Sequence, residues 1–243
     1  MKNVEPTPIY KLINTKTGGS IDRVTIDLDL NEYLKKKIRD TNRLRNNLDL
    51  SKSIYIRKYI DVFQFKQPYN IAFFTFKNIA PFKLDDVSFY MFLDFDINGL
   101  DGFDNDLGVF DEEEGIIFQY DDTNTYAGFC SVKQPSSFEV SNSNKMLSRA
   151  KSIQLNNIIE DKPGEKTSAL AWNFGTLNKG ELLQIPIIIS GGLSKEELLS
   201  NLKEGKNRAN SLIPQVLKSI NSRVRQIQDE KFVKMNETTT EEC

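Results

Sequence analysis

The order of the sequence patterns constrains the fold of this chain more than any other feature. Helical periodicity dominates only after Gly192, and apolar runs of strand length come before it. A parallel βαβ fold would alternate strands with helices along the whole chain, so this segregation argues against it. The sequence therefore predicts a mainly β fold, an antiparallel β-sandwich of about eight to ten strands with helical additions. The strand-like runs are 53–65, 70–79, 87–97, 108–122, 125–132, 168–177 and 181–192.

Residues 1–192 are expected to form the β-sandwich domain. Its first part, 9–30, has the pattern of two short strands around a Thr-Gly-Gly-Ser turn, and the spacing of apolar residues predicts a helix near 31–48. The segment 134–144 is rich in serine and asparagine and is interpreted as a polar loop.

The last part of the chain is expected to be a helical extension over 193–232. Ser194 and Glu197 fit a capping box, in which the two side chains bind backbone N–H groups at a helix start. Pro214 is placed to begin a second helix, because the first helical turn tolerates proline. Residues 233–243 have no periodicity and are expected to be a disordered tail.

Histidine is absent from the 243 residues, and this absence narrows the possible chemistry. Catalysis by Ser-His-Asp or Cys-His arrangements is excluded, as are zinc sites built on imidazole. The two cysteines are too few for an all-thiolate zinc site or a disulfide framework. Cys130 lies in an apolar run and is expected to be a buried thiol, whereas Cys243 ends the polar tail. Any chemistry must come from carboxylates, lysine, tyrosine or a hard cation.

The net charge of −2 hides a strong segregation of charge. Residues 84–132 contain thirteen Asp and Glu and no Lys or Arg, whereas residues 31–66 hold ten basic side chains against four acidic ones. The basic side chains are not interleaved with glycines and aromatic residues, as they usually are in single-strand binders, so nucleic acid is not the expected partner. The acidic part instead raises the question of what neutralises it: a cation, a basic partner or the 31–66 segment.

The sequence contains no signal for a membrane or for export. No apolar run approaches the ~20 residues that span a bilayer. The start, MKNVEPTPIY, lacks the basic-then-apolar pattern of a secretory signal. We therefore expect a cytoplasmic protein without a membrane partner.

The stretch DFDINGLDGFDND, residues 94–106, is the most specific candidate site. Its first half has the spacing of a calcium loop, because alternate acidic residues and a turn-making glycine converge oxygen ligands on one point. Its second half departs from an EF-hand, since Asn105 stands where the bidentate glutamate belongs and a strand precedes the loop. The alternative is a solvated hairpin loop in which Asp, Asn and Gly make turns. The candidate Ca²⁺ ligands are Asp94, Asp96, Asn98, Asp101 and Asp104.

Two further sets of side chains are candidate binding surfaces. Tyr120, Tyr126 and Trp172 would suit a platform on which a sugar ring stacks; alternatively, Trp172 belongs to the core, because its neighbours are apolar. A helical stripe of apolar residues covers 209–227 and packs on the sandwich, mediates formation of a homo-oligomer, or links to another domain. Its candidate partner-binding residues are Leu212, Val216, Ile220 and Val224.

One segment, ALAWNFGTLNKGELLQIPIIISGGLSKEELLSNLKEG, resembles the end of the β-sandwich domain that precedes the catalytic barrel in microbial glucoamylase- and glucodextranase-like glycoside hydrolases. FYMFLDFDINGLDGFDNDLGVFDEEEGIIFQYDD is similar to the central strands of those domains. The resemblance covers about residues 9–205 and implies a supersandwich-like module. Those enzymes carry their two catalytic glutamates in the barrel, so the resemblance implies no catalytic residue here. The matching residues are Leu177, Gly180 with Glu181, Ile185 to Ile189, and Ser194 with Glu196 and Glu197.

Three functions remain open on the sequence. The first is a non-catalytic β-sandwich module that binds a carbohydrate or a partner chain and is stabilised by Ca²⁺. The second is a structural or assembly protein that contacts its partners through the C-terminal helix. The third is a glycan hydrolase that uses carboxylates alone, which requires two of them about 5–10 Å apart across a cleft.

Overall fold

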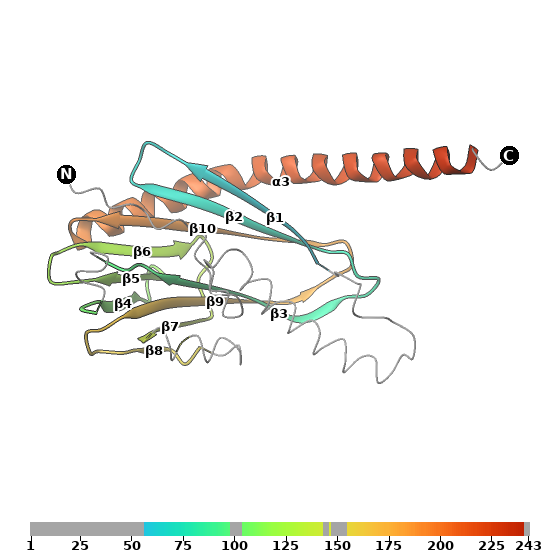
Figure 1. Cartoon of the computed structure of the whole chain (residues 1–243). Coiled ribbons are helices and arrows are strands. Elements are labelled where there is room, and N and C mark those ends of the chain that lie inside the picture. The colour runs from blue at the N-terminus through green and yellow to red at the C-terminus, as the bar shows by residue number, and fades with distance from the viewer. Residues whose placement is uncertain (1–55, 98–103, 143–145, 147–154, 241–243) are drawn as a thin grey trace, which may run out of the picture.

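The computed structural model describes residues 56–97, 104–142, 146 and 155–240 of the chain (Figure 1). Within these ranges ten strands are followed by the helix α3, Lys195–Thr240. The strands are β1 Ile56–Gln64, β2 Tyr69–Asn78, β3 Leu84–Asp94, β4 Leu107–Asp111, β5 Ile116–Tyr120, β6 Tyr126–Ser131, β7 Ser137–Asn142, β8 Ile158–Ile159, β9 Lys166–Leu177 and β10 Leu182–Gly192.

The strands form two sheets that face each other (Figure 1). The larger sheet has six strands in the order β1-β2-β10-β6-β5-β4, and the smaller sheet has four in the order β3-β9-β7-β8. Neighbouring strands are antiparallel except β7 and β8, which pair in parallel. The prediction of a mainly β sandwich with a C-terminal helix is confirmed.

Of three further predicted elements, two lie outside the described residues and one differs from the structure. The hairpin over 9–30 and the helix near 31–48 lie outside the described residues. The interpretation of 134–144 as a polar loop is wrong in part, because β7 forms there and pairs with β9. Val140 on β7 is fully buried and Phe138 packs against the core. Pairing with a buried strand outweighs the weak strand propensity of the surrounding serines and asparagines.

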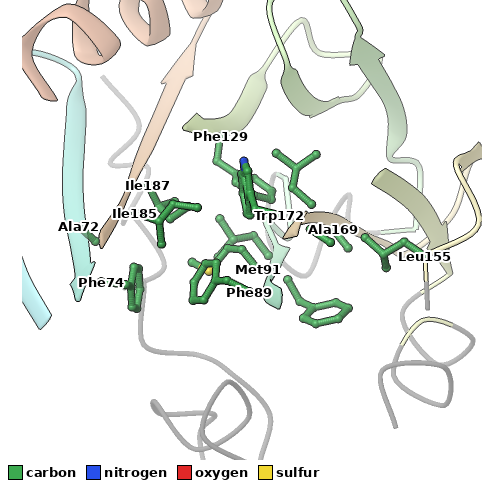
Figure 2. Close-up of a cluster of buried hydrophobic side chains, with 14 of the residues drawn as sticks. Ala72, Phe74, Phe89, Met91, Phe129, Leu155, Ala169, Trp172, Ile185 and Ile187 are labelled. Carbon is green, nitrogen blue, oxygen red and sulfur yellow. The ribbon is translucent and has the colours of Figure 1, made fainter. Parts of the chain in front are cut away.

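The inner faces of the two sheets bury an apolar core (Figure 2). Phe89 on β3 lies 5.3 Å from Phe74 on β2 and 5.9 Å from Trp172 on β9, measured between ring centroids. These contacts join both sheets, and burial of each such side chain contributes about 1.5–3 kcal/mol relative to exposure. Other buried members of this cluster are Met91, Phe129, Ala169, Ile185 and Ile187.

The outer face of the larger sheet is covered by α3 (Figure 1). Four residues predicted to bind a partner, Leu212, Val216, Ile220 and Val224, are 0–7% exposed and belong to one buried cluster with side chains of β2, β5, β6 and β10. Their assignment to a partner interface is therefore corrected. They pack on the sandwich, which was one of the three alternatives for this stripe. An apolar stripe shows that a helix face is covered, but it does not show by what.

The start of α3 follows the predicted capping box. The Ser194 hydroxyl accepts a hydrogen bond from the backbone N–H of Glu197 at 3.1 Å. The Glu197 carboxylate in turn accepts one from the backbone N–H of Leu193 at 2.7 Å. Each bond satisfies a donor near the helix start that the helix itself leaves unpaired.

The rest of α3 is more continuous than predicted. Pro214 lies within the helix instead of beginning a second one, and its ring is exposed. Buried apolar contacts on both sides of this residue offset the hydrogen bond that proline cannot donate. The helical backbone also continues through 233–240, where a disordered tail was expected, because extending an existing helix orders only one residue at a time. No helix in the described part of the chain combines the length and the apolarity needed to cross a bilayer.

Gly205 marks a close approach of α3 to the sheet. A Cβ at this position would overlap Cγ2 of Ile188 on β10 and lie 3.4 Å from the ring of Tyr69 on β2. Alanine normally stabilises a helix by about 1 kcal/mol over glycine, but overpacking costs about 1–3 kcal/mol. We expect Gly205→Ala to lower the free energy of unfolding by about 1 kcal/mol, measured by urea denaturation.

The control for this prediction is Asn207→Ala on the exposed face of the same helix. It has no sheet contact to disturb, so its stability should equal or exceed that of the wild type. A Gly205→Ala protein that gains as much stability as Asn207→Ala would contradict the close packing of α3 on β10.

Candidate functional site

A groove lies between β4, at the edge of the larger sheet, and β7 of the smaller sheet. Its volume is about 510 Å³, inside the range of about 300–1,000 Å³ that is typical of ligand pockets. Residues of the β4–β5 turn, the β6–β7 connection and the segment before β8 complete its walls. The lining residues are Phe110, Glu112, Gln134, Pro135, Ser136, Ser137, Phe138 and Asn157.

Two phenylalanines supply the apolar part of the groove. Phe110 on β4 and Phe138 on β7 stack with ring centroids 4.0 Å apart and planes inclined by 22°. Both are partly buried and pack against the core, and the pair links the edge strand β4 of the larger sheet to β7 of the smaller sheet. The pair is therefore held by the framework of the sandwich and supplies most of the apolar lining of the groove.

Polar groups surround this apolar surface. The Glu112 carboxylate, the Ser137 hydroxyl and the Asn157 amide nitrogen make no hydrogen bond within the described residues. Asn157 is nevertheless fixed, since its Oδ1 accepts a hydrogen bond from the N–H of Phe138 and its own N–H donates to the Phe138 carbonyl, both at 3.0 Å. The groove thus offers an acceptor, a hydroxyl and a donor around the ring pair, and the donor on Asn157 is held in place.

One wall of the groove is tied to the β4–β5 turn. The Gln134 amide donates a hydrogen bond to the Glu113 carbonyl at 2.8 Å. Gly115 has a φ of 62°, in the left-handed region, and a Cβ there would overlap the Gln134 side chain. The turn can lie this close to Gln134 because glycine fills the position. The wall is consequently preorganised before any ligand arrives.

Trp172 does not belong to this groove or to any exposed platform. Its side chain is fully buried between the sheets, which corrects its assignment to sugar binding (Figure 2). Its indole N–H donates to the Lys133 carbonyl at 2.8 Å, and Lys133 directly precedes Gln134 of the groove wall. An apolar strand around a lone tryptophan, as in this sequence, is typical of a core position.

Tyr120 and Tyr126 lie together on the opposite face of the larger sheet. They pair across β5 and β6, and their rings stack with centroids 5.4 Å apart and planes inclined by 12°. Both are partly buried against the cluster beneath α3. The structure therefore brings the two tyrosines together but separates them from Trp172, and their role in sugar binding stays a prediction.

The predicted calcium loop is described only in part. Asn98 and Asp101 lie outside the described residues. Asp94 ends β3, Asp96 has a φ of 41° in the left-handed region, and Asp104 is exposed. Among the described residues, no three side chains of Asp, Glu or Cys are grouped closely enough to hold a metal ion. The cation role of the five predicted ligands stays a prediction.

Asp106 is the unexpected member of the acidic region. Its side chain is only 1% exposed, and neither carboxylate oxygen has a well-aligned hydrogen-bond donor. Burial raises the pKa of Asp106 to about 7; the backbone of Ile97 opposes this rise, and the charges of Asp121, Asp94 and Asp96 add to it. A buried carboxyl among other carboxylates needs either a proton or a cation to balance its charge.

The sequence did not reveal the Phe110–Phe138 pair or the burial of Asp106. Phe110 and Phe138 are 28 residues apart and meet only because β4, an edge strand of the larger sheet, lies against β7 of the smaller sheet. Nothing in the stretch 94–106 distinguishes Asp106 from its neighbours Asp104 and Asn105, which are exposed in the structure. The one available signal was its place directly before the apolar run of β4.

Comparison with known proteins gives a distant structural likeness and no family. No protein-family model and no curated protein sequence matches the chain. Among solved structures, a crystal structure of bacterial glucoamylase complexed with acarbose is similar at 13% sequence identity, with a TM-score of 0.48. The similar region covers 63% of this chain and 22% of the glucoamylase chain, so this chain spans about a fifth of that protein. Function is therefore inferred from the residues of this chain.

Proposed function

We propose that this chain is a non-catalytic β-sandwich module that binds an uncharged carbohydrate in the groove between β4 and β7. The observation that carries the proposal is the stacked Phe110–Phe138 pair, surrounded by polar side chains that have hydrogen-bonding capacity to spare. The groove is open to solvent, is framed by β4 and β7 and has a volume within the range of ligand sites.

The chemistry of the groove fits a sugar ring better than other small ligands. A pyranose has an apolar face of C–H groups, which suits a flat aromatic surface, and a rim of hydroxyls, which both donate and accept hydrogen bonds. The Glu112 carboxylate would accept from a hydroxyl, the Asn157 amide nitrogen would donate to one, and Ser137 would do either. None of the eight lining residues is cationic, so the groove does not favour an anionic ligand.

The same lining argues for binding without hydrolysis. Glycoside hydrolysis uses two carboxyl groups about 5–10 Å apart, one on each side of the scissile bond. Glu112 is the one carboxylic acid among the eight lining residues. The chain has no histidine to act as an acid or base in place of a second carboxyl group.

The single tryptophan provides a direct test of this function. Because the Trp172 indole N–H is bound to the residue that precedes Gln134, its ¹⁵N–¹H signal is expected to shift when a ligand fills the groove. We would titrate ¹⁵N-labelled protein with α- and β-linked glucose trisaccharides and with the trisaccharide of N-acetylglucosamine. Phe110→Leu keeps an apolar side chain but removes the aromatic ring, and Glu112→Gln removes the charge. Each is expected to weaken binding about tenfold or more.

The matched control is Phe65→Leu, the same substitution in the cluster beneath α3, and it should bind as the wild type does. No saturable shift with any trisaccharide would contradict carbohydrate binding. Weakened binding in Tyr120→Leu, together with unchanged binding in Phe110→Leu, would move the site to the tyrosine pair.

A further inference from the structure

We propose that a hard divalent cation, with Ca²⁺ as the leading candidate, binds at the end of the sandwich where Asp106 lies among Asp94, Asp96 and Asp121. This inference is independent of the proposed carbohydrate site. It also differs from the predicted calcium loop, because its central ligand is a residue outside that set of five.

The sheet topology brings these aspartates to one end of the molecule. Asp106 directly precedes β4 and Asp121 directly follows β5, and these strands pair with Leu107 opposite Tyr120. The two aspartates therefore lie next to each other beyond the last pair of the ladder. Asp94 ends β3, and the charges of Asp94, Asp96 and Asp121 all act on Asp106.

Asp106 differs from its neighbours in its contacts. The Asp121 carboxylate accepts hydrogen bonds from the Thr123 hydroxyl at 2.7 Å and from the Thr123 backbone N–H at 3.1 Å. The Asp94 carboxylate accepts one from the Thr167 hydroxyl at 3.5 Å. Asp106 is 1% exposed, and neither of its carboxylate oxygens has a well-aligned donor. An ionised carboxylate in such a place has lost its hydration, and the backbone of Ile97 compensates for this loss only in part.

The Asp106 carboxylate makes no ion pair with a basic side chain of the described residues. Lys and Arg are absent from 84–132. The segment before β9 does reach Asp106, but through its main chain, since the Gly164 N–H donates to the Asp106 carbonyl at 3.1 Å. Lys166 is already paired with Glu160 at 3.1 Å. A cation from solution would neutralise Asp106 without displacing any of these contacts.

The chemistry of the donors selects the kind of cation. All four side chains are carboxylates, which hard cations prefer, and the chain contains no imidazole for softer ones. No three acidic side chains of the described residues already converge, so the proposed coordination uses Asp106, a neighbouring carboxylate, backbone carbonyls and water. Ca²⁺ accepts about 6–8 such oxygens in flexible geometry, whereas Mg²⁺ demands a strict octahedron.

The test is a Ca²⁺ titration of protein first treated with a chelator, at about pH 8, where Asp106 is ionised. Calorimetry should show saturable binding, and the melting temperature should rise with Ca²⁺. At 100 times the dissociation constant, the unfolding equilibrium constant should fall about 100-fold. Asp106→Asn removes the buried charge, so this variant should fold, bind Ca²⁺ at least tenfold more weakly and show a smaller rise in melting temperature with Ca²⁺ than the wild type does.

The control is Asp122→Asn, which removes an exposed acidic side chain next to Asp121 and should respond to Ca²⁺ as the wild type does. A wild-type protein that shows neither heat of binding nor a change in melting temperature overturns the proposal. Equal Ca²⁺ affinity in Asp106→Asn overturns it as well, because the cation would then sit elsewhere. Neither result bears on the groove, whose ligand is read from the Trp172 signal.

Discussion

Ile220→Asp is expected to lower the free energy of unfolding by about 3–5 kcal/mol. Ile220 is fully buried in the cluster that α3 forms with the larger sheet. The substitution removes apolar contacts and places a carboxylate where the packed sheet excludes water. Since domains of this size are stable by about 5–15 kcal/mol, the variant should unfold at much lower urea concentration, as followed by circular dichroism.

Asn221→Asp is the matched control for this prediction. It introduces the same charge at the next position of the same helix, on the exposed face. A surface change of this kind typically alters stability by less than about 0.5 kcal/mol. If instead Ile220→Asp keeps wild-type stability and changes the molar mass measured by light scattering, the apolar stripe would face a second chain and the packing of α3 would be wrong.

Much of the secondary structure could be predicted from the sequence, because burial of one face makes apolar residues recur at a regular spacing. Strand-like patterns such as 70–79 and 181–192 coincide closely with β2 and β10. The capping box at Ser194 located the start of α3. β7 was missed because this segment forms a strand by pairing with β9. The sequence of one segment does not show which other strand it will pair with.

The candidate sites were less accessible, since they depend on which side chains meet. Trp172 and Tyr120 were grouped in one candidate platform, with a core position as the alternative for Trp172, and the structure places Trp172 inside the sandwich and Tyr120 against the cluster beneath α3. The groove depends on the contact between Phe110 and Phe138 across the two sheets. The spacing of residues along the sequence does not predict such a contact. Local patterns predict elements, whereas sites at sheet edges require the strand order.

β4 connects the two proposed sites. Its first residue follows Asp106, and near its other end Phe110 enters the groove. At about 3.4 Å per residue, the two ends of this strand are less than 20 Å apart. Gly108 in its middle lies so close to β7 that a Cβ would overlap Val140. A cation that neutralises Asp106 would therefore stabilise the edge strand that carries half of the aromatic pair.

The stability of the metal-free protein is expected to rise as the pH falls from about 8 to about 5, by about 2–3 kcal/mol. The pKa of Asp106 is raised from 3.8 to about 7 in the folded protein, chiefly by burial. In the unfolded chain the same carboxyl returns to its ordinary value. Between these two values the folded state binds a proton that the unfolded state does not, so the stabilisation is complete below the unfolded pKa and is lost as the pH rises through about 7.

The absence of histidine makes this window unusually clear to interpret. No other side-chain type has an unperturbed pKa between about 5 and 8, so the slope of stability against pH reports mainly on Asp106. Urea midpoints of Asp106→Asn should be nearly independent of pH in this range and exceed those of the wild type at about pH 8. Saturating Ca²⁺ should stabilise the wild type more at about pH 8 than at about pH 5, because the cation competes with the proton for the same carboxylate. A wild-type protein whose midpoint is constant across this range would show that Asp106 is not held as a buried, unbalanced carboxyl.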